Sequence, residues 1–86
     1  MYDKEVELNK IDIYDLVRRV CLAKTHCDRL VKTSGSFTFG AAMQFETGDS
    51  WQTMAIIDVL IDTGMYREPY RDNDVAYQHR VFVEAG

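Results

Sequence analysis

The sequence predicts an α+β domain of three helices followed by a C-terminal β-hairpin. Apolar side chains recur at helical spacing over residues 12–32 and again over residues 49–64. Two later stretches, 65–70 and 76–83, instead alternate apolar and polar side chains with a period of two. Helical periodicity that gives way to strand periodicity indicates helices packed beside a small antiparallel sheet.

The composition is that of one small acidic domain. The chain has 86 residues, and 47% of them are hydrophobic, which suffices for a single core. No repeat or linker divides the chain, so residues 1–86 are expected to form one domain. The 14 acidic and 10 basic side chains give a formal net charge of −4. That balance disfavours a general attraction to nucleic acid or to an anionic membrane.

The cysteines and the hydropathy predict a reducing compartment. Cys21 and Cys27 fall within one helical pattern, separated by roughly 9 Å of helix rise, which is beyond the reach of a disulfide. Both are therefore expected to be reduced. The chain shows no charged-then-apolar leader and no apolar run near the ~18 residues of a membrane span. A cytoplasmic location is the expectation.

The first two segments differ in how clearly they are patterned. Residues 1–10 lack a period and are expected to form an extended or frayed arm. From Ile11 a helical stripe begins, with Asn9 or Asp12 as the cap, and predicts a helix over residues 12–32. The opposite face of this helix carries half of the basic side chains: Arg18, Arg19, Lys24, Arg29 and Lys32. A solvated face explains these cations, and a binding role is the alternative.

Shorter elements follow. Residues 33–36 have the composition of a loop, and residues 37–39 are β-prone and predict a short pairing strand. Residues 40–46 have weak helical character. If Thr38 caps this segment, it forms a helix of two turns. A turn over residues 47–49 then leads into the next helix.

The central helix is predicted over residues 49–64. Asp49 or Ser50 serves as its cap, and Gly64 is placed to end it in a left-handed conformation. Its apolar stripe consists of Ile56, Ile57, Leu60 and Ile61. Trp51 in the first turn has two interpretations, which both stay open: a core residue packed under the preceding helix, or an exposed anchor for a partner.

The last third of the chain predicts the hairpin. Its strands, 65–70 and 76–83, are joined by residues 71–75. Pro69 has no N–H to donate, so its strand must be an edge strand or carry a bulge there. The buried face of the hairpin is expected to consist of Tyr66, Tyr70, Tyr77, Val81 and Val83.

No pattern in the chain indicates catalysis, a cofactor or a metal. Four side chains of metal-binding type, Cys21, His26, Cys27 and His79, lack the paired spacing of a zinc site. His26 and Cys27 diverge by about 100° on a helix, so they do not form a nucleophile pair. The run Asp72-Asn73-Asp74 lacks the glycine and glutamate of a calcium loop and is interpreted as the hairpin turn. There is no glycine-rich phosphate loop. A non-enzymatic protein is expected.

The order of these elements resembles the winged helix-turn-helix family. Residues 32–39 look like the loop and strand before its second helix, residues 47–53 like the turn into its recognition helix, and residues 60–65 like the end of that helix before the wing. The resemblance covers roughly residues 12–84 and implies three helices with a C-terminal hairpin wing. In that family the recognition helix reads base edges and basic residues contact phosphate. The nucleic-acid contacts that this implies here are Ser50, Gln52, Arg67, Arg71 and Arg80.

The distribution of charge favours a protein partner over DNA. Residues 33–66 contain no Lys or Arg but four acids, Glu46, Asp49, Asp58 and Asp62. Phosphates would be repelled by such a segment, whereas a basic protein surface would be attracted.

The leading hypothesis is therefore a regulatory inhibitor or adaptor, and small inhibitors made by phages resemble this chain in size and charge. The expected partner-binding residues are Asp49, Trp51, Gln52, Asp58 and Asp62. The alternative is a dimeric DNA-binding transcriptional regulator, and a homodimer is compatible with both hypotheses.

Overall fold

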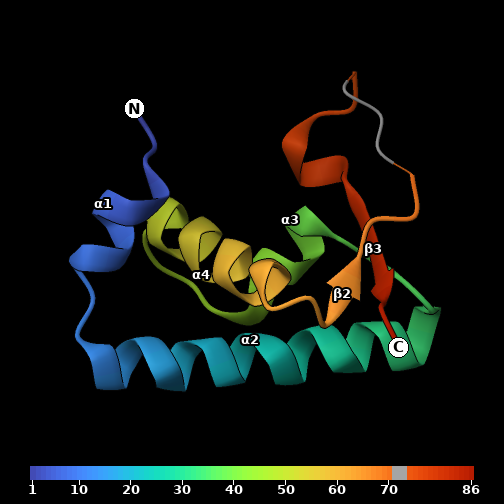
Figure 1. Ribbon diagram of the computed structural model, residues 1–86, viewed down its shortest axis with the longest axis horizontal. Helices are drawn as coiled ribbons and strands as arrows, with labels where there is room; N and C mark the ends of the chain where they lie inside the picture. The colour runs from blue at the N-terminus through green and yellow to red at the C-terminus, as the bar shows by residue number, and fades with distance from the viewer. Residues whose placement is uncertain (71–73) are drawn as a thin grey trace.

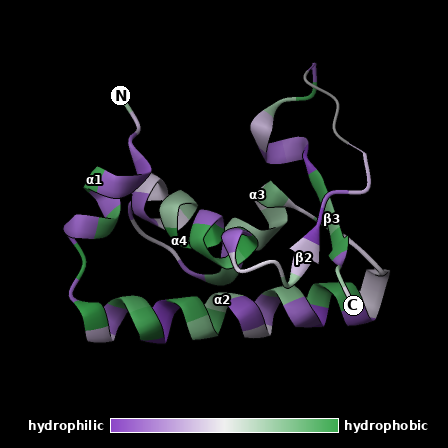
Figure 2. Cartoon of the chain, viewed as in Figure 1, coloured by the Kyte–Doolittle hydropathy of each residue, from purple (hydrophilic) through white to green (hydrophobic). Residues whose placement is uncertain are grey.

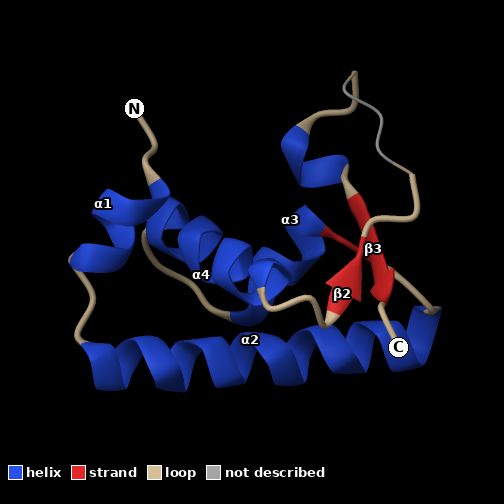
Figure 3. Cartoon of the chain, in the orientation of Figure 1, coloured by secondary structure: helices blue, strands red, loops and turns tan. Residues whose placement is uncertain are grey.

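The computed structural model describes residues 1–70 and 74–86 and has an α+β fold, as the sequence predicts (Figures 1 and 3). Within these residues, four α-helices and two 3-10 turns accompany a three-stranded antiparallel sheet. The elements are, in chain order, α1 (Lys4–Asn9), α2 (Ile13–Ser34), β1 (Phe37–Thr38), α3 (Phe39–Ala42), η1 (Met43–Phe45), α4 (Ser50–Asp62), β2 (Tyr66–Arg67), η2 (Tyr77–His79) and β3 (Val81–Glu84).

Helix α2 confirms the prediction over residues 12–32 and extends slightly beyond it. The Asp12 carboxylate accepts the backbone N–H groups of Tyr14 and Asp15, so Asp12 is the cap. The helix ends at Gly35, which has a φ of +81° and donates its N–H to the Val31 carbonyl at 2.7 Å. Hydrophobic and hydrophilic residues alternate along α2, as Figure 2 shows. The buried ones, Ala23 and Cys27, face the rest of the fold.

Helix α4 lies between α1 and α2 and supplies the centre of the core (Figure 1). Asp49 caps it by accepting the N–H groups of Trp51 and Gln52, and Gly64 follows its end with a φ of +81°. Both features match the sequence prediction. The fully buried core side chains come from four elements: Ala23 and Cys27 of α2, Phe39 and Ala42 of α3, Ala55, Ile56, Ile57 and Leu60 of α4, and Phe82 of β3.

The N-terminal segment corrects the expectation of an extended or frayed arm over residues 1–10. Residues Lys4–Asn9 form α1, which Asp3 caps through the N–H groups of Glu5 and Val6. The helix packs against α4, and Glu7 is buried at that contact. A six-residue helix is too short to show a period, and its stability comes from packing rather than from its own sequence.

The sheet has the order β1-β3-β2, with both pairings antiparallel. Phe37 is opposite Phe82, and Arg67 is opposite Val83. Thr38 both pairs in β1 and caps α3, because its hydroxyl accepts the Ala41 N–H at 3.1 Å. Pro69 lies beyond the two-residue strand β2, so it interrupts no pairing.

The predicted buried face of the hairpin is wrong except at Tyr66. Residues Tyr77–His79 form a 3-10 turn, and β3 begins only at Val81. Phe82 points into the core, while Tyr70, Tyr77 and Val81 are exposed and Val83 is half-buried. Because strand side chains alternate, seating Phe82 in the core turns both flanking valines outward.

Phe82 takes the inner position because of its aromatic neighbours. Its ring stacks on Phe37 at a centroid distance of 5.7 Å and lies 6.4 Å from Phe39. A phenylalanine buries more apolar area than a valine, so this arrangement is favoured over the inverse one.

Candidate interaction face

One side of α4 carries Trp51, Asp58 and Asp62, whose spacing of seven and four residues places them on a common face. Helix α1 and the residues before it lie along this face (Figure 1). Three of the five predicted partner-binding residues therefore lie together, and the N-terminal segment adds Tyr2, Lys4 and Glu5 beside them. We call this surface the α1–α4 face. Its residues are Tyr2, Asp3, Lys4, Glu5, Trp51, Asp58 and Asp62.

Asp58 joins three parts of the chain. The Tyr2 hydroxyl donates to its Oδ2 at 2.8 Å, and the Tyr77 hydroxyl donates to its Oδ1. Burial, and then the hydrogen bond to this carboxylate, raise the pKa of both tyrosines well above its ordinary value. The Asp58 carboxylate therefore fastens the N-terminus and the η2 turn to α4, in addition to contributing charge.

Asp62 and Asp49 are engaged in simpler ways. Lys4 Nζ donates to Asp62 Oδ2 at 2.7 Å, and this hydrogen bond raises the pKa of Lys4. Both side chains are substantially exposed, so the pair contributes little to stability. Asp49 caps α4, and its negative charge suits the positive end of the helix dipole.

Trp51 is at the margin of the fold. Its side chain is 42% exposed, and it does not belong to the core cluster. The Tyr2 ring contacts it edge-on, with the ring centroids 6.4 Å apart. The structure thus places a tryptophan and a tyrosine together at the surface, where each has one side supported by the protein and another exposed to solvent.

The α1–α4 face is strongly acidic. It presents four carboxylates, those of Asp3, Glu5, Asp58 and Asp62, against the single lysine Lys4. Glu7 also belongs to α1, but it is buried and paired with Lys10 at 3.3 Å. A face with this charge attracts cationic surfaces and repels phosphates.

Gln52 lies on another side of α4, within a half-buried polar network. Its side-chain oxygen accepts Arg19 Nη1 at 3.2 Å. Arg19 also forms a bidentate pair with Glu46, at 3.0 Å from Nε and 2.5 Å from Nη2, and Thr53 donates to Glu46 at 3.1 Å. The hydrogen bond to Glu46 raises the pKa of Arg19. This network connects α2 to α4 and neutralises the charge of Glu46.

The residues of the DNA-binding alternative belong to different elements: Ser50 and Gln52 lie in the first turn of α4, Arg67 lies in β2 and Arg80 directly precedes β3. Ser50 and Arg67 are exposed, whereas Arg80 is held by Glu68 through bonds of 2.9 and 2.8 Å. The Arg80 guanidinium also lies 5.0 Å from the centroid of the Tyr77 ring. Arg71 lies outside the described residues, as does most of the predicted turn at 72–74. Of the arginines in this alternative that the structure describes, Arg67 is exposed and Arg80 is already paired with Glu68.

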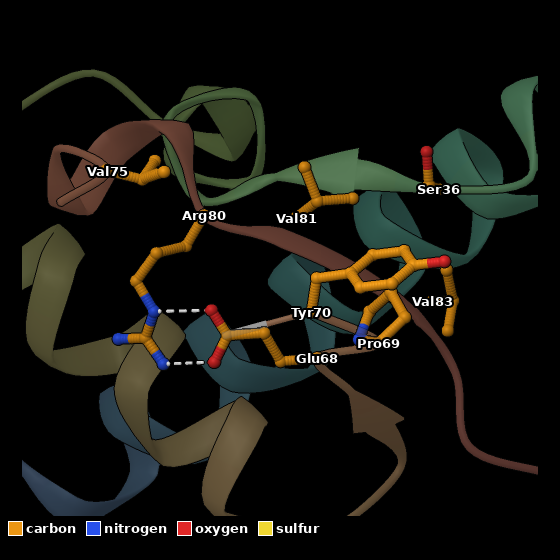
Figure 4. A pocket seen from close by; sticks show the side chains of 8 residues that line it. All are labelled: Ser36, Glu68, Pro69, Tyr70, Val75, Arg80, Val81 and Val83. Carbon is orange, nitrogen blue, oxygen red and sulfur yellow. Dashed lines mark hydrogen bonds and ion pairs between the residues drawn. The ribbon is translucent and has the colours of Figure 1, made fainter. Parts of the chain in front are cut away.

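A cavity of about 460 Å³ opens on the outer side of the sheet (Figure 4). Val81 and Val83 line it because Phe82 turns inward, and the Arg80–Glu68 pair lies at one end. The other lining residues are Ser36, Pro69, Tyr70 and Val75. Its walls are mainly apolar. No predicted partner-binding residue lies in it.

The chemically reactive side chains have structural surroundings. His26 Nε2 lies 2.9 Å from the Ala41 carbonyl oxygen, which ties α2 to α3. Both cysteines are free, with Cys21 exposed and Cys27 buried, and burial raises the pKa of the Cys27 thiol to about 12. Across residues 1–70 and 74–86, His, Cys, Asp and Glu form no group of three suited to a metal ion. In the same part of the chain, no helix is long and apolar enough to cross a membrane.

Comparison with protein-family models, curated proteins and solved structures finds no match for this chain. A functional assignment therefore depends on the chemistry of its surfaces. The sequence located Trp51, Asp58 and Asp62 but missed Tyr2, Lys4 and Glu5. A signal for α1 was present, because Asp3 followed by Glu5 and Glu7 has the pattern of a capped helix start with acids in its first turn.

Proposed function

We propose that this chain is a non-enzymatic interaction module of winged-helix type that binds a basic protein surface through its α1–α4 face. The layout supports the comparison with winged helices: α2, β1, the α3–η1 segment and α4 precede two strands, and the last strand lies in the middle of the sheet. Helix α4 takes the position of the recognition helix in that arrangement. Here α1 packs across it.

The observation that carries the proposal is the composition of the α1–α4 face. Four carboxylates and one lysine share this face with Trp51, which is 42% exposed, and with the half-buried Tyr2, whose ring contacts it. Opposite charges across an interface accelerate association and exclude wrong partners, while partly buried aromatic side chains provide the anchors that dominate affinity. A cationic protein surface with an apolar depression complements both features.

The mode of action follows from this chemistry. Carboxylates held on a rigid helix pair occupy the positions that phosphates would take on a cationic groove. The module thereby acts as an inhibitor or adaptor of a protein whose basic surface also suits nucleic acid. No bond is made or broken, and no cofactor is needed.

The test reverses charge at exposed carboxylates that contribute little to the stability of the fold: Glu5 and Asp62, whose pair with Lys4 is exposed. Asp49 and Asp58 are unsuitable, because one caps α4 and the other accepts two tyrosine hydroxyls. Glu5→Lys and Asp62→Lys change exposed side chains. Glu84→Lys makes the same charge change on β3 and serves as the matched control. Thermal melting confirms that all three variants fold.

Immobilised protein is used to capture partners from a nuclease-treated lysate. Wild type and Glu84→Lys should retain the same protein, and the Glu5→Lys/Asp62→Lys variant should lose it. Capture that disappears after nuclease treatment, or that survives the double reversal unchanged, would contradict the proposal.

Titration with duplex DNA separates the proposal from the alternative of a DNA-binding regulator. Fluorescence anisotropy at two salt concentrations should show no salt-sensitive binding by the wild type. The alternative requires the opposite: binding that tightens on charge reversal, weakens with Arg67→Ala and falls as salt rises.

A further inference from the structure

Helix α1 is attached to the fold by polar contacts more than by apolar packing. Among the described residues, the core cluster and the half-buried hydrophobic side chains packed against it include nothing before Ile11. Helices α2, α3 and α4 each contribute at least two fully buried apolar side chains. In α1, by contrast, Val6 is 49% exposed and Leu8 is only half-buried. The buried side chain of α1 is the carboxylate of Glu7.

The burial of Glu7 works against the docking of α1. Its side chain is 4% exposed and pairs with Lys10 at 3.3 Å, and the side chain of Lys10 is itself exposed. Removing a carboxylate from water costs free energy, which a long ion pair to an exposed lysine offsets only in part. Releasing α1 from α4 would return this carboxylate to water.

The side-chain links that hold the N-terminal segment on α4 are few. The Tyr2 hydroxyl donates to Asp58 at 2.8 Å, and the Tyr2 ring contacts Trp51 edge-on. Lys4 pairs with Asp62 at 2.7 Å, but both side chains are substantially exposed, so this pair contributes little. The attachment therefore depends mainly on Tyr2.

We propose that residues 1–10 form a releasable strap over α4, which unfolds and refolds locally while the rest of the domain stays folded. Segments with few buried apolar contacts open at a lower free energy than the core. A helix of six residues is not stable in water by itself, so release of the strap and unfolding of α1 are one event. The strap is anchored at Ile11, which packs against the core, and at Asp12, which caps α2.

Release of the strap changes the surface that α4 presents. Ala55 is fully buried but lies outside the core cluster formed by the described residues. It follows Trp51 by four residues and precedes Asp58 by three, which places it on the side of α4 that α1 covers (Figure 1). Release uncovers Ala55 and detaches the strap from Asp58 and Asp62.

The strap is therefore a switch for the α1–α4 face. Docking assembles that face from two segments of the chain, and release dismantles it without unfolding the core. This consequence rests on the proposed function, whereas the local opening of the strap does not.

Native-state hydrogen exchange, measured by NMR on the full chain, tests the opening. The Glu7 N–H donates to the Asp3 carbonyl at 3.0 Å and reports on α1, and the N–H of the buried Leu60 reports on the core. Relative to their intrinsic rates, Glu7 should exchange at least about tenfold faster than Leu60, because the strap opens without global unfolding.

Two substitutions separate local opening from global unfolding. Tyr2→Phe removes a bond made only in the docked state, so it should speed the exchange of Glu7 at least about threefold. Ile57→Val is the control, because Ile57 is fully buried in the core cluster, which the docked and released states share. It should speed the exchange of Leu60 about two- to tenfold and leave Glu7 unchanged.

Three results would each overturn the strap: Glu7 protected as strongly as Leu60, exchange of Glu7 that Tyr2→Phe does not alter, or exchange of Glu7 that Ile57→Val accelerates as much as it accelerates Leu60. These measurements need no partner, so failure of the strap and failure of the proposed function are observed separately. In the complex with the captured protein, exchange of Glu7 should slow at least about tenfold, because the partner binds the docked state. Unchanged exchange of Glu7 in that complex would overturn the role of the strap as a switch.

Discussion

Removing the Asp58 carboxylate should loosen two distant parts of the fold at once. Asp58→Ala deletes the acceptor for the hydroxyls of Tyr2 and Tyr77, which lie 56 and 19 residues away in the chain. A hydrogen bond to a charged group contributes about 1.5–3 kcal/mol, and less where water can replace the acceptor. Both tyrosines are partly exposed, so we expect the substitution to lower the free energy of unfolding by about 1–3 kcal/mol.

Thermal and urea unfolding measure this loss. In a domain of this size, the expected change lowers the Tm by roughly 5–20 °C. Asp62→Ala is the control, because it removes an exposed carboxylate from the same helix face and should change stability by no more than about 1 kcal/mol.

A double-mutant cycle then tests the reasoning itself. If Asp58 fastens the N-terminus, Tyr2→Phe should cost stability in the wild type and almost none in the Asp58→Ala background. The same should hold for Tyr77→Phe. Strictly additive effects in both cycles would refute the claim that Asp58 joins these segments.

Three further predictions concern the fold. Phe82→Ala should lower the free energy of unfolding, measured in urea, by about 3–5 kcal/mol, because it empties a fully buried site. Val81→Ala, on the outer side of the sheet, should lower it by less than about 1 kcal/mol. Equal losses would mean that the inward-facing residue of β3 is misassigned. Gly64→Val should cost at least about 1 kcal/mol, because φ is +81° at that position, and a neutral result would place the end of α4 elsewhere. Alkaline pH should destabilise the protein. Burial, and then hydrogen bonds to carboxylates, raise the pKa values of Tyr66 and Tyr77 in the folded state. The stability that these two tyrosines contribute is therefore complete below their pKa in the unfolded chain, near 10, and is lost as the pH rises above that value. Urea unfolding across that pH range should show the free energy of unfolding falling as the pH rises, and falling less for Tyr77→Phe. A free energy of unfolding that does not change with pH would contradict this prediction.

The helices were predictable because their signals are local. In α2 and α4, the cap, the apolar spacing and the terminal glycine all fall within one segment and agree with one another. Helix α1 escaped prediction because six residues show no period, and its stability depends on α4, which lies more than forty residues later in the sequence.

The hairpin could not be oriented from the sequence, since both of its faces are apolar. Val81 and Val83 on one side and Phe82 on the other fit a period of two equally well. The choice is made by Phe37 and Phe39, whose rings meet Phe82 from a distant segment. Such a choice depends on tertiary packing, which alternation within a strand does not reveal.

The candidate face was predictable in its charge but not in its geometry. Acids at positions 49, 58 and 62 are visible in the sequence, and helical spacing brings two of them into line. The convergence of Tyr2 and Tyr77 on Asp58 depends on how α1 and η2 pack, so the structural role of Asp58 became apparent only in the structure.

The most direct test of the central claim is the rate at which the captured protein associates with this chain at two salt concentrations. If the α1–α4 face meets a basic surface, wild-type association should be fast and should slow as salt rises, and the Glu5→Lys/Asp62→Lys variant should associate more slowly and lose most of that salt dependence. Glu84→Lys should behave as the wild type. A double reversal that associates at the wild-type rate, or faster, would contradict the claim that the carboxylates of this face guide binding.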